Sequence, residues 1–288
     1  MRTSCKKQIN RNLLKNKTLL IKVGGNALTT PEVTDHIAEQ IAVLTDLGAA
    51  VVIVHGGGIE INTLLNLHEI DSEFVDGHRK TDAASLAVIE MALSGKVNKQ
   101  LVECFQKQEV NAVGLSGKDG RMVTAKRRFH KTTVNGALNE SDLGFVGDVS
   151  VIDPTLIRLL LSNHYTPVIS PISAGSNGGA LNVNADMFAG HLAASLQADH
   201  FIALTNIDGL LRDPEKPETL IRELTRDEAE QLTGQTLRGG MIPKIEACLT
   251  ALQHPGCTAH IVNGTKDQQL LRIFTSGEST GTTIAQSR

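Results

Sequence analysis

The residues best suited to chemistry stand where a buried strand is predicted to run into a helix. The first is Lys22, which Gly24 and Gly25 follow, after an apolar run at 18–21. A glycine turn there lets backbone N–H groups converge, and the dipole of the next helix adds partial positive charge. With the charge of Lys22, such a turn could hold a phosphate or a carboxylate. A tight turn beside a surface lysine is the simpler alternative, because these turns often contain glycine.

The same arrangement recurs about thirty residues later. An apolar run at 49–54 leads into His55, Gly56, Gly57 and Gly58, and a helical pattern follows. Two anion-holding turns at the carboxyl ends of strands predict one crevice at the edge of a parallel sheet. We interpret His55 as a structural residue rather than a catalytic one.

Three further charged residues are candidates for the same crevice. Arg79 could clamp a carboxylate through two N–H groups, although a lone loop arginine is more often solvated. Asp186 could simply cap a helix. Lys244 stands near a predicted helix start, where the helix dipole disfavours a cation, and this favours a role with an anion. Together with Lys22 and the glycine turns, these charges suit phosphoryl transfer, which depends on positioning and electrostatic stabilisation.

The elements that must position these residues alternate along the chain. Strands are predicted over 18–21, 49–54, 110–115, 166–170, 201–205 and 259–262. Helices are predicted over 31–46, 59–67, 83–93, 97–108, 154–161, 186–196, 243–252 and 268–274, with Gly95 ending one of them and a Thr225–Glu228 capping box starting another. Segments 74–79 and 142–148 read as loops, and 121–134 as a hairpin or an excursion. This alternation predicts a mostly parallel sheet covered on both faces.

Composition excludes several classes of protein. The 288 residues carry a formal net charge of −3 and no tryptophan, which argues against a nucleic-acid partner. The four scattered cysteines fit a reducing cytosol and argue against a disulfide framework or a zinc site. No apolar run is long enough to span a membrane. The basic segment 1–17 lacks a secretory apolar core and reads as a frayed tail, with an oligomer contact or a transit peptide as alternatives.

Seven segments of the sequence carry a resemblance to a known family. Neither a P-loop nor a Rossmann fingerprint is present. The segments are K-V-G-G-N-A, V-H-G-G-G, G-H-R-K-T-D, G-L-S-G-K-D-G, L-N-V-N-A-D, T-N-I-D-G-L-L and G-G-M-I-P-K. Each is weak alone, but in this order, from Thr18 to Ile284, they make the chain resemble the amino acid kinase family. The resemblance implies an open αβα sandwich of class α/β with a mostly parallel central sheet and two lobes.

The resemblance also implies an activity and a division of the chain. The activity is ATP-dependent phosphorylation of the γ-carboxylate of N-acetyl-L-glutamate, a step of arginine biosynthesis. Residues 18–196 would bind the acylated amino acid and form a homodimer, and residues 197–288 would bind ATP. A kinase of carrier-linked aminoadipate or glutamate, and a catalytically silent sensor, are the rival functions. A cytoplasmic location is expected, with no membrane or nucleic-acid partner.

Roles for individual residues follow from the same resemblance. Lys22 and Lys244 would stabilise the transferring phosphoryl group, and Asp186 would hold both lysines. Backbone N–H groups of Gly24, Gly25, Gly57 and Gly58 would meet phosphate and substrate oxygens. Arg79 and Asn182 would bind acetylglutamate. The nucleotide would lie against Thr205, Asn206, Ile207, Asp208, Gly209, Leu210, Gly239, Gly240 and Met241. Mg²⁺ would sit on phosphates and water, without a protein metal site.

Insensitivity to arginine is a further expectation. Relatives that arginine inhibits carry a longer N-terminal helix, an acidic residue in the late helix and a G-I-G-T ending. Here Arg272 stands in place of the acidic residue, and 278–282 reads E-S-T-G-T. An arginine at that place would repel a cationic effector.

Overall fold

The computed structural model describes residues 13–24, 30–75, 78–134, 137–213, 215–233, 239–276 and 280–287. Its centre is an eight-stranded sheet in the order β14-β16-β15-β11-β1-β2-β8-β5. The strands are β1 (Thr18–Val23), β2 (Ala50–His55), β5 (Ala112–Ser116), β8 (Thr166–Ser170), β11 (His200–Thr205), β14 (Glu223–Thr225), β15 (Thr258–Asn263) and β16 (Thr282–Ala285). Among these described strands, β15 and β16 form the antiparallel pair and the other neighbours are parallel. The predicted mostly parallel sheet is confirmed.

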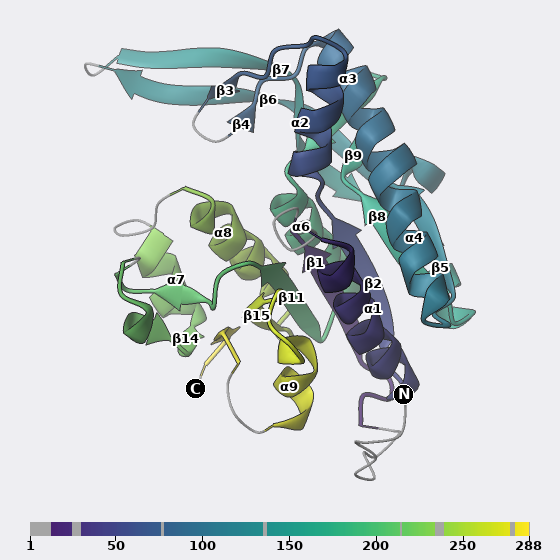
Figure 1. Cartoon of the computed structure of the whole chain (residues 1–288). Helices are drawn as coiled ribbons and strands as arrows, with labels where there is room; N and C mark the ends of the chain where they lie inside the picture. The colour runs from purple at the N-terminus through teal and green to yellow at the C-terminus, as the bar shows by residue number, and fades with distance from the viewer. Residues whose placement is uncertain are drawn as a thin grey trace.

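Helices cover both faces of the sheet (Figure 1). One face packs against α1 (Pro31–Asp46), α4 (Asn98–Lys107) and α9 (Gln269–Thr275). The other packs against α5 (Thr155–Ser162), α6 (Ala185–Leu196), α7 (Arg226–Thr233) and α8 (Met241–Ala251). Because side chains alternate along a strand, Leu19 and Ile21 join the first core while Leu20 joins the second. Lys22 therefore lies on the α6–α8 side and His55 on the α4 side.

A second, four-stranded closed sheet stands beside the first. It consists of β6 (Val123–Val134), β7 (Ala137–Ile152), β9 (Ile172–Gly175) and β10 (Ala180–Val183). β6 and β7 form a long hairpin that projects from the body (Figure 1), so the hairpin prediction for 121–134 is confirmed. The loop prediction for 142–148 is wrong, because these residues lie within β7. Glycine and aspartate in 142–148 have low strand propensity. Cross-strand ion pairs from Arg127 to Asp142 (3.2 Å) and from Arg128 to Asp148 (2.8 Å) stabilise the pairing of β6 with β7 there.

The helical layer above the sheet departs from two expectations. α2 (Gly58–Leu67) precedes α3 (Ala83–Glu90), which continues through a π-helical segment, Met91–Val97, directly into α4. Gly95 thus does not end a helix, because Leu93 and Val97 on either side of it are buried and hold the segment against the core. The loop prediction for 74–79 is wrong for its described residues, because β3 (Phe74–Val75) pairs antiparallel with β4 (His78–Arg79). Within the described residues, no helix is long and apolar enough to cross a membrane.

Smaller elements complete the C-terminal part. β12 (Leu210–Leu211) pairs with β13 (Leu220–Ile221), and short 3₁₀ turns occupy Asp119–Arg121 and Pro217–Thr219. The capping box is confirmed: Thr225 N–H donates to Glu228 Oε2 (2.7 Å), and Glu228 N–H donates to Thr225 Oγ1 (3.2 Å). Met91, the first residue of the π-helical segment, is 53% exposed.

The two predicted lobes share the central sheet. Residues before 196 supply β5, β8, β2 and β1, and residues after 197 supply β11, β15, β16 and β14. The two sets meet where β1 pairs in parallel with β11. The boundary between lobes at 196 and 197 stays a prediction.

Candidate functional site

The two glycine turns lie side by side at the carboxyl ends of β1 and β2. Val23 pairs with His55 across the two strands, and Gly56 N–H donates to Val23 O at 3.0 Å. Gly24 N–H donates to Leu204 O at 3.2 Å, which ties the first turn to β11. The structure therefore gathers the turns of three neighbouring strands at one edge of the sheet.

A cluster of three charged side chains occupies this edge. Lys22 Nζ lies 2.8 Å from Asp186 Oδ1, and Lys244 Nζ lies 3.2 Å from Asp186 Oδ2. We call these three residues the buried cluster, because the side chains of Lys22, Lys244 and Asp186 are only 6%, 16% and 8% exposed. They come from β1, α8 and α6, which are far apart in sequence. Two lysines on one carboxylate leave one net positive charge, which favours binding of an anion.

Burial and mutual attraction set the protonation of the cluster. Desolvation alone would raise the pKa of Asp186, but the charges of Lys22 and Lys244 outweigh it and hold that pKa below its ordinary value. Burial lowers the pKa of Lys22, and Lys244 adds to the lowering while Asp186 opposes it. The contact with Asp186 therefore opposes the loss of the Lys22 proton that burial favours.

Helix capping explains how Asp186 becomes available. Asn184 is the N-cap of α6, and its Oδ1 accepts from Asp186 N–H (2.9 Å) and from Met187 N–H (3.2 Å). The simple reading of Asp186 as the cap is therefore wrong. Its carboxylate lies in the first turn of α6, where the helix dipole favours a negative charge. Asp186 is thus free to face both lysines.

The glycines of the turns differ in what surrounds them. A Cβ on Gly24 would lie 3.2 Å from Leu204 O and 3.4 Å from Lys22 Nζ, so the turn passes close to the lysine. A Cβ on Gly57 would collide with Leu93 Cδ2 at 2.7 Å, whereas Gly58 is open to solvent. Gly25 lies outside the described residues.

Arg79 and Asn182 lie outside the buried cluster. Arg79 Nη2 donates to Asn62 Oδ1 at 2.6 Å, Nη1 donates to Ser72 Oγ, and the guanidinium lies 4.5 Å from the centroid of the Phe74 ring. Asn182 lies in β10, the strand that leads to Asn184 and the start of α6. Among the described residues, no ion pair or hydrogen bond connects Arg79 to the buried cluster.

The segment expected to hold the nucleotide follows β11. Thr205 is buried, while Asn206, Ile207 and Asp208 are exposed. Asp208 forms an ion pair with Lys266 (2.7 Å) and accepts from Asn263 Nδ2 (2.8 Å). Asp208 and Lys266 form what we call the exposed cluster, whereas Asn263 beside them is buried.

Leu210 differs from the rest of that segment. Its side chain is buried in the core and its N–H donates to Thr282 Oγ1 (2.8 Å), so it presents no free N–H to a ligand. Gly209, with a φ of 141°, makes the turn that brings Leu210 there.

Gly239, Gly240 and Met241 lead into α8. Gly239 has a φ of 59°, and a Cβ on Gly239 or Gly240 would meet no atom within 4 Å, so their backbone is open to a ligand. Lys244 Nζ donates to Gly240 O at 3.3 Å, which links this turn to the buried cluster. Met241 is half-buried against the core.

His55 and Asn98 form a buried pair behind the second glycine turn. His55 Nδ1 lies 2.9 Å from Gly56 O, and Nε2 lies 3.1 Å from Asn98 Nδ2. The interpretation of His55 as structural rather than catalytic agrees with this burial. Sequence reasoning missed Asn98, although its position three residues before Leu101 and seven before Phe105 places it on the buried face of α4. An amide on an apolar helix face was the available signal.

The side chains present fit a magnesium ion that arrives with a nucleotide. Within the described ranges, no group of three or more His, Cys, Asp or Glu side chains could hold a metal ion. Asp186 directs one oxygen to each lysine. Because Mg²⁺ commonly binds through substrate phosphates and water with few protein ligands, this donor set is compatible with it.

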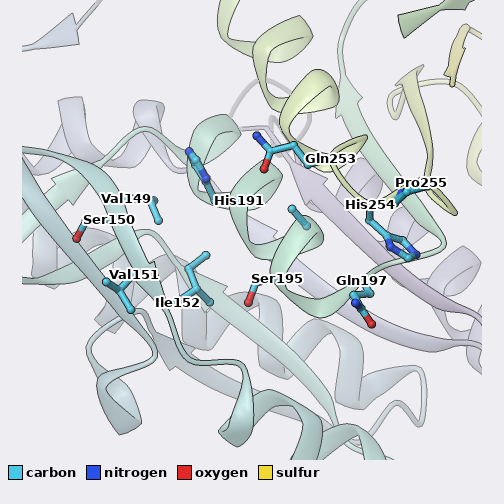
Figure 2. Close-up of a pocket in the computed structure, with 11 residues that line it drawn as sticks. Val149, Ser150, Val151, Ile152, His191, Ser195, Gln197, Gln253, His254 and Pro255 are labelled. Carbon is cyan, nitrogen blue, oxygen red and sulfur yellow. The ribbon is translucent and has the colours of Figure 1, made fainter.

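A cavity of about 480 Å³ lies elsewhere, between β7, α6 and the turn after α8 (Figure 2). Val149, Ile152, His191, Ser195 and Gln253 are among the residues that line it. No predicted site residue contributes to it, so it is separate from the strand-end site.

Comparison with known proteins places the chain in a family. The model of the amino acid kinase family matches residues 17–263. Acetylglutamate kinase of Heliobacterium modesticaldum is 40% identical over 270 residues, 93% of this chain and 92% of that protein. Acetylglutamate kinase of Synechococcus sp. (strain CC9311) is 43% identical over 261 residues, 90% of this chain and 88% of that protein.

Solved structures share the fold. N-acetylglutamate synthase from Neisseria gonorrhoeae, complexed with coenzyme A and N-acetyl-glutamate, matches with a TM-score of 0.79 and 24% identity over 97% of this chain. The chain spans 62% of that synthase. Carbamate kinase from Giardia lamblia bound to AMP-PNP matches with a TM-score of 0.67 and 16% identity, over 94% of this chain and 99% of that chain. At these identities the likeness concerns the fold alone.

Proposed function

The chain belongs to the amino acid kinase family, and we propose that it uses ATP to phosphorylate the γ-carboxylate of N-acetyl-L-glutamate. The product is N-acetyl-L-glutamyl 5-phosphate, an intermediate of arginine biosynthesis. Curated relatives at 37–43% identity over most of the chain are named acetylglutamate kinase, which supports this substrate. The observation that carries the proposal is the buried cluster, in which two lysines share one carboxylate at the strand ends.

The chemistry explains why positive charge rather than a base is needed. A γ-carboxylate has an ordinary pKa of about 4.3, so it is already ionised and nucleophilic at neutral pH. The obstacle is the repulsion between that carboxylate and the polyphosphate of ATP. Lys22 and Lys244 would offset this repulsion and stabilise the charge on the transferring phosphoryl group.

Each remaining part of the edge has a proposed task. Asp186 holds the two ammonium groups in place, because each of its oxygens contacts one of them. The N–H groups of Gly24, Gly57 and Gly58, with those of Gly25, would meet phosphate and carboxylate oxygens. Mg²⁺, held by the phosphates and water, would neutralise part of the nucleotide charge.

The two substrates would approach from opposite halves of the sheet. Arg79 and Asn182 would bind acetylglutamate beside β2 and β10. Residues 205–209 and 239–241 would hold ATP beside β11 and α8. The junction of the halves is the β1–β11 pair, where Lys22 lies.

Assembly and location extend the proposal. A homodimer and a cytoplasmic location stay predictions, the first from family habit and the second from the unpaired cysteines. Cys104, Cys248 and Cys257 are free and buried. Light scattering of the purified chain would measure its mass in solution. Activity across millimolar arginine would test the predicted insensitivity to that effector.

A coupled assay of ATP turnover tests the reaction itself. N-acetyl-L-glutamate, glutamate and aspartate are offered separately, and the acyl phosphate is trapped with hydroxylamine. We expect turnover with acetylglutamate well above that with the other two. A carrier-linked glutamate or aminoadipate is offered as a fourth substrate. Equal or greater turnover with it would favour the rival kinase, and nucleotide binding without turnover would favour a sensor.

A further inference from the structure

The second glycine turn is held from beneath by a buried chain of hydrogen bonds. His55, the last residue of β2, and Asn98, the first of α4, both have fully buried side chains. His55 Nδ1 lies 2.9 Å from Gly56 O, and its Nε2 lies 3.1 Å from Asn98 Nδ2. Asn98 Nδ2 also donates to Val168 O at 2.8 Å and lies 3.2 Å from Leu115 O, so the chain is tied to β8 and β5.

The partners determine which nitrogen of His55 carries the proton. A carbonyl oxygen only accepts, so Nδ1 must be protonated and donate to Gly56 O. Nε2 faces an amide N–H group and must accept. Burial lowers the pKa of His55 to about 4; the hydrogen bond to Gly56 opposes this and the charge of Lys99 adds to it. The ring is therefore neutral at physiological pH, in the tautomer that its two neighbours permit.

The geometry of the Gly56–Gly57 peptide group links the hydrogen bond of His55 to the direction of the next N–H group. The Gly56 carbonyl and the Gly57 N–H belong to one planar trans peptide, so they point in opposite directions. With the carbonyl fixed toward the buried ring, the Gly57 N–H points away from it. Within the described part of the chain, no backbone carbonyl accepts from this N–H. It is available to a ligand.

Close packing leaves the turn little freedom. A Cβ on Gly57 would lie 2.7 Å from Leu93 Cδ2 and 3.2 Å from Val97 Cγ2, both in the π-helical segment. A Cβ on Gly114 would lie 2.1 Å from Asn98 Oδ1, so Asn98 fits only because β5 has a glycine there. Segment 93–98 therefore both supports the turn and supplies the amide that orients His55.

We propose that His55 and Asn98 are positioning residues, which fix the Gly56–Gly57 peptide so that the Gly57 N–H points at an oxygen of the acetylglutamate carboxylate or of the transferring phosphoryl group. The proposal rests on the proposed function. It assigns to the buried pair a task beyond filling the core: the exact orientation of one donor at the reacting groups. Preorganised donors of this kind act without reorganisation during the reaction.

Two matched substitutions separate positioning from packing. His55→Asn places an amide nitrogen where Nδ1 lies, and His55→Gln places one where Nε2 lies, because the two side chains reach as far from Cβ as those ring nitrogens. Only the first can donate to Gly56 O. If His55 merely fills space, glutamine, which is closer to histidine in volume, should be tolerated at least as well as asparagine.

Steady-state kinetics provide the first readout. We expect His55→Gln to lower kcat/KM for acetylglutamate by about 10²-fold, the scale of a misplaced reacting group, with the KM for ATP unchanged. His55→Asn should retain most of the activity. Equal losses in the two variants, or full activity of His55→Gln, would overturn the proposal. Ser94→Ala is the control. Ser94 belongs to the same π-helical segment, and the substitution removes its hydrogen bond to Ser170 of β8 (2.7 Å) but none of the bonds between His55, Gly56 and Asn98.

Nitrogen NMR of His55 provides a readout independent of substrate. The wild-type ring should show a protonated Nδ1 and an unprotonated Nε2 between pH 6 and 8. The opposite tautomer would overturn the positioning proposal whatever the substrate. An enzyme with the expected tautomer but no turnover of acetylglutamate would instead show that the proposed function is wrong. Thermal unfolding of each variant identifies any that fails to fold.

Discussion

Two lysine–aspartate clusters lie at the same edge of the sheet and differ in burial. In the buried cluster the side chains of Lys22 and Asp186 are 6% and 8% exposed, whereas Lys266 and Asp208 of the exposed cluster are 55% and 44% exposed. The contact distances are similar, 2.8 Å and 2.7 Å. Equal geometry therefore does not imply equal energy, because water screens the second pair and is excluded from the first.

The number of partners is the second difference. Asp208 satisfies one lysine and one amide, so the exposed cluster is electrically neutral. Asp186 faces two lysines, so the buried cluster carries excess positive charge in a low-dielectric place. Such a site favours binding of an anion, which suits the proposed transfer of a phosphoryl group. Burial and charge imbalance together therefore distinguish the cluster that we propose to be catalytic from the exposed one.

Removing the shared carboxylate should have the largest effect. In Asp186→Asn, two buried ammonium groups lose their counter-charge, and breaking a buried pair costs about 3–5 kcal/mol. Chemical denaturation at pH 7 should show this loss, with kcat also reduced. Because the pKa of Asp186 is depressed by folding, its contribution is present above about pH 4, the ordinary aspartate value, and is lost as pH falls through the lower folded pKa. The stability difference between variant and wild type should narrow in that acid range.

Removing either lysine comes next. We expect Lys22→Ala or Lys244→Ala to lower kcat by about 10²–10³-fold, the cost of losing one charge-stabilising donor, while KM values change much less. Lys107→Ala is the matched control, since Lys107 pairs with Glu103 on the exposed side of α4. Near-normal kcat in either variant would show that the corresponding lysine does not face the transferring group.

Substitution of Arg79 tests the proposed acetylglutamate-binding half of the sheet edge, which neither cluster occupies. Arg79→Ala should raise the KM for acetylglutamate about 10–100-fold, since a hydrogen bond to a charged group contributes about 1.5–3 kcal/mol. The KM for ATP should hardly change. Arg79→Lys should rescue binding only in part, because an ammonium group cannot bind a carboxylate through a planar fork. Parallel losses of affinity for both substrates would contradict the assignment of the two halves.

The exposed cluster should respond least. Lys266→Ala is expected to change the free energy of unfolding by less than about 1 kcal/mol, as for other solvated ion pairs, and the change should shrink further in high salt. Urea titrations at low and high salt measure both effects. A loss as large as that of Asp186→Asn would remove the distinction between the two clusters.

Much of the secondary structure could be predicted from local sequence patterns. The helix over 31–46, the capping box at Thr225 and the alternating core positions depend on spacing and caps, which neighbouring residues determine. The exceptions needed partners distant in sequence. Gly95 lies inside a continuous helix because buried neighbours hold it, and 142–148 is extended because β6 pairs with it. Local propensity predicts neither, since tertiary contacts supply the missing energy.

For the site, the sequence pattern alone predicted Lys22, the glycine turns, Asp186 and Lys244, because charged residues beside predicted strand ends and helix starts can be recognised without a structure. Only the tertiary structure decided that these charges meet, that Asn184 rather than Asp186 caps α6, and that Asn98 contacts His55. The physical reason is that an ion pair or a hydrogen bond depends on distance and burial, and packing of β1, α6 and α8 determines both. The sequence determines which charged side chains are present, and the fold determines which of them are buried away from water.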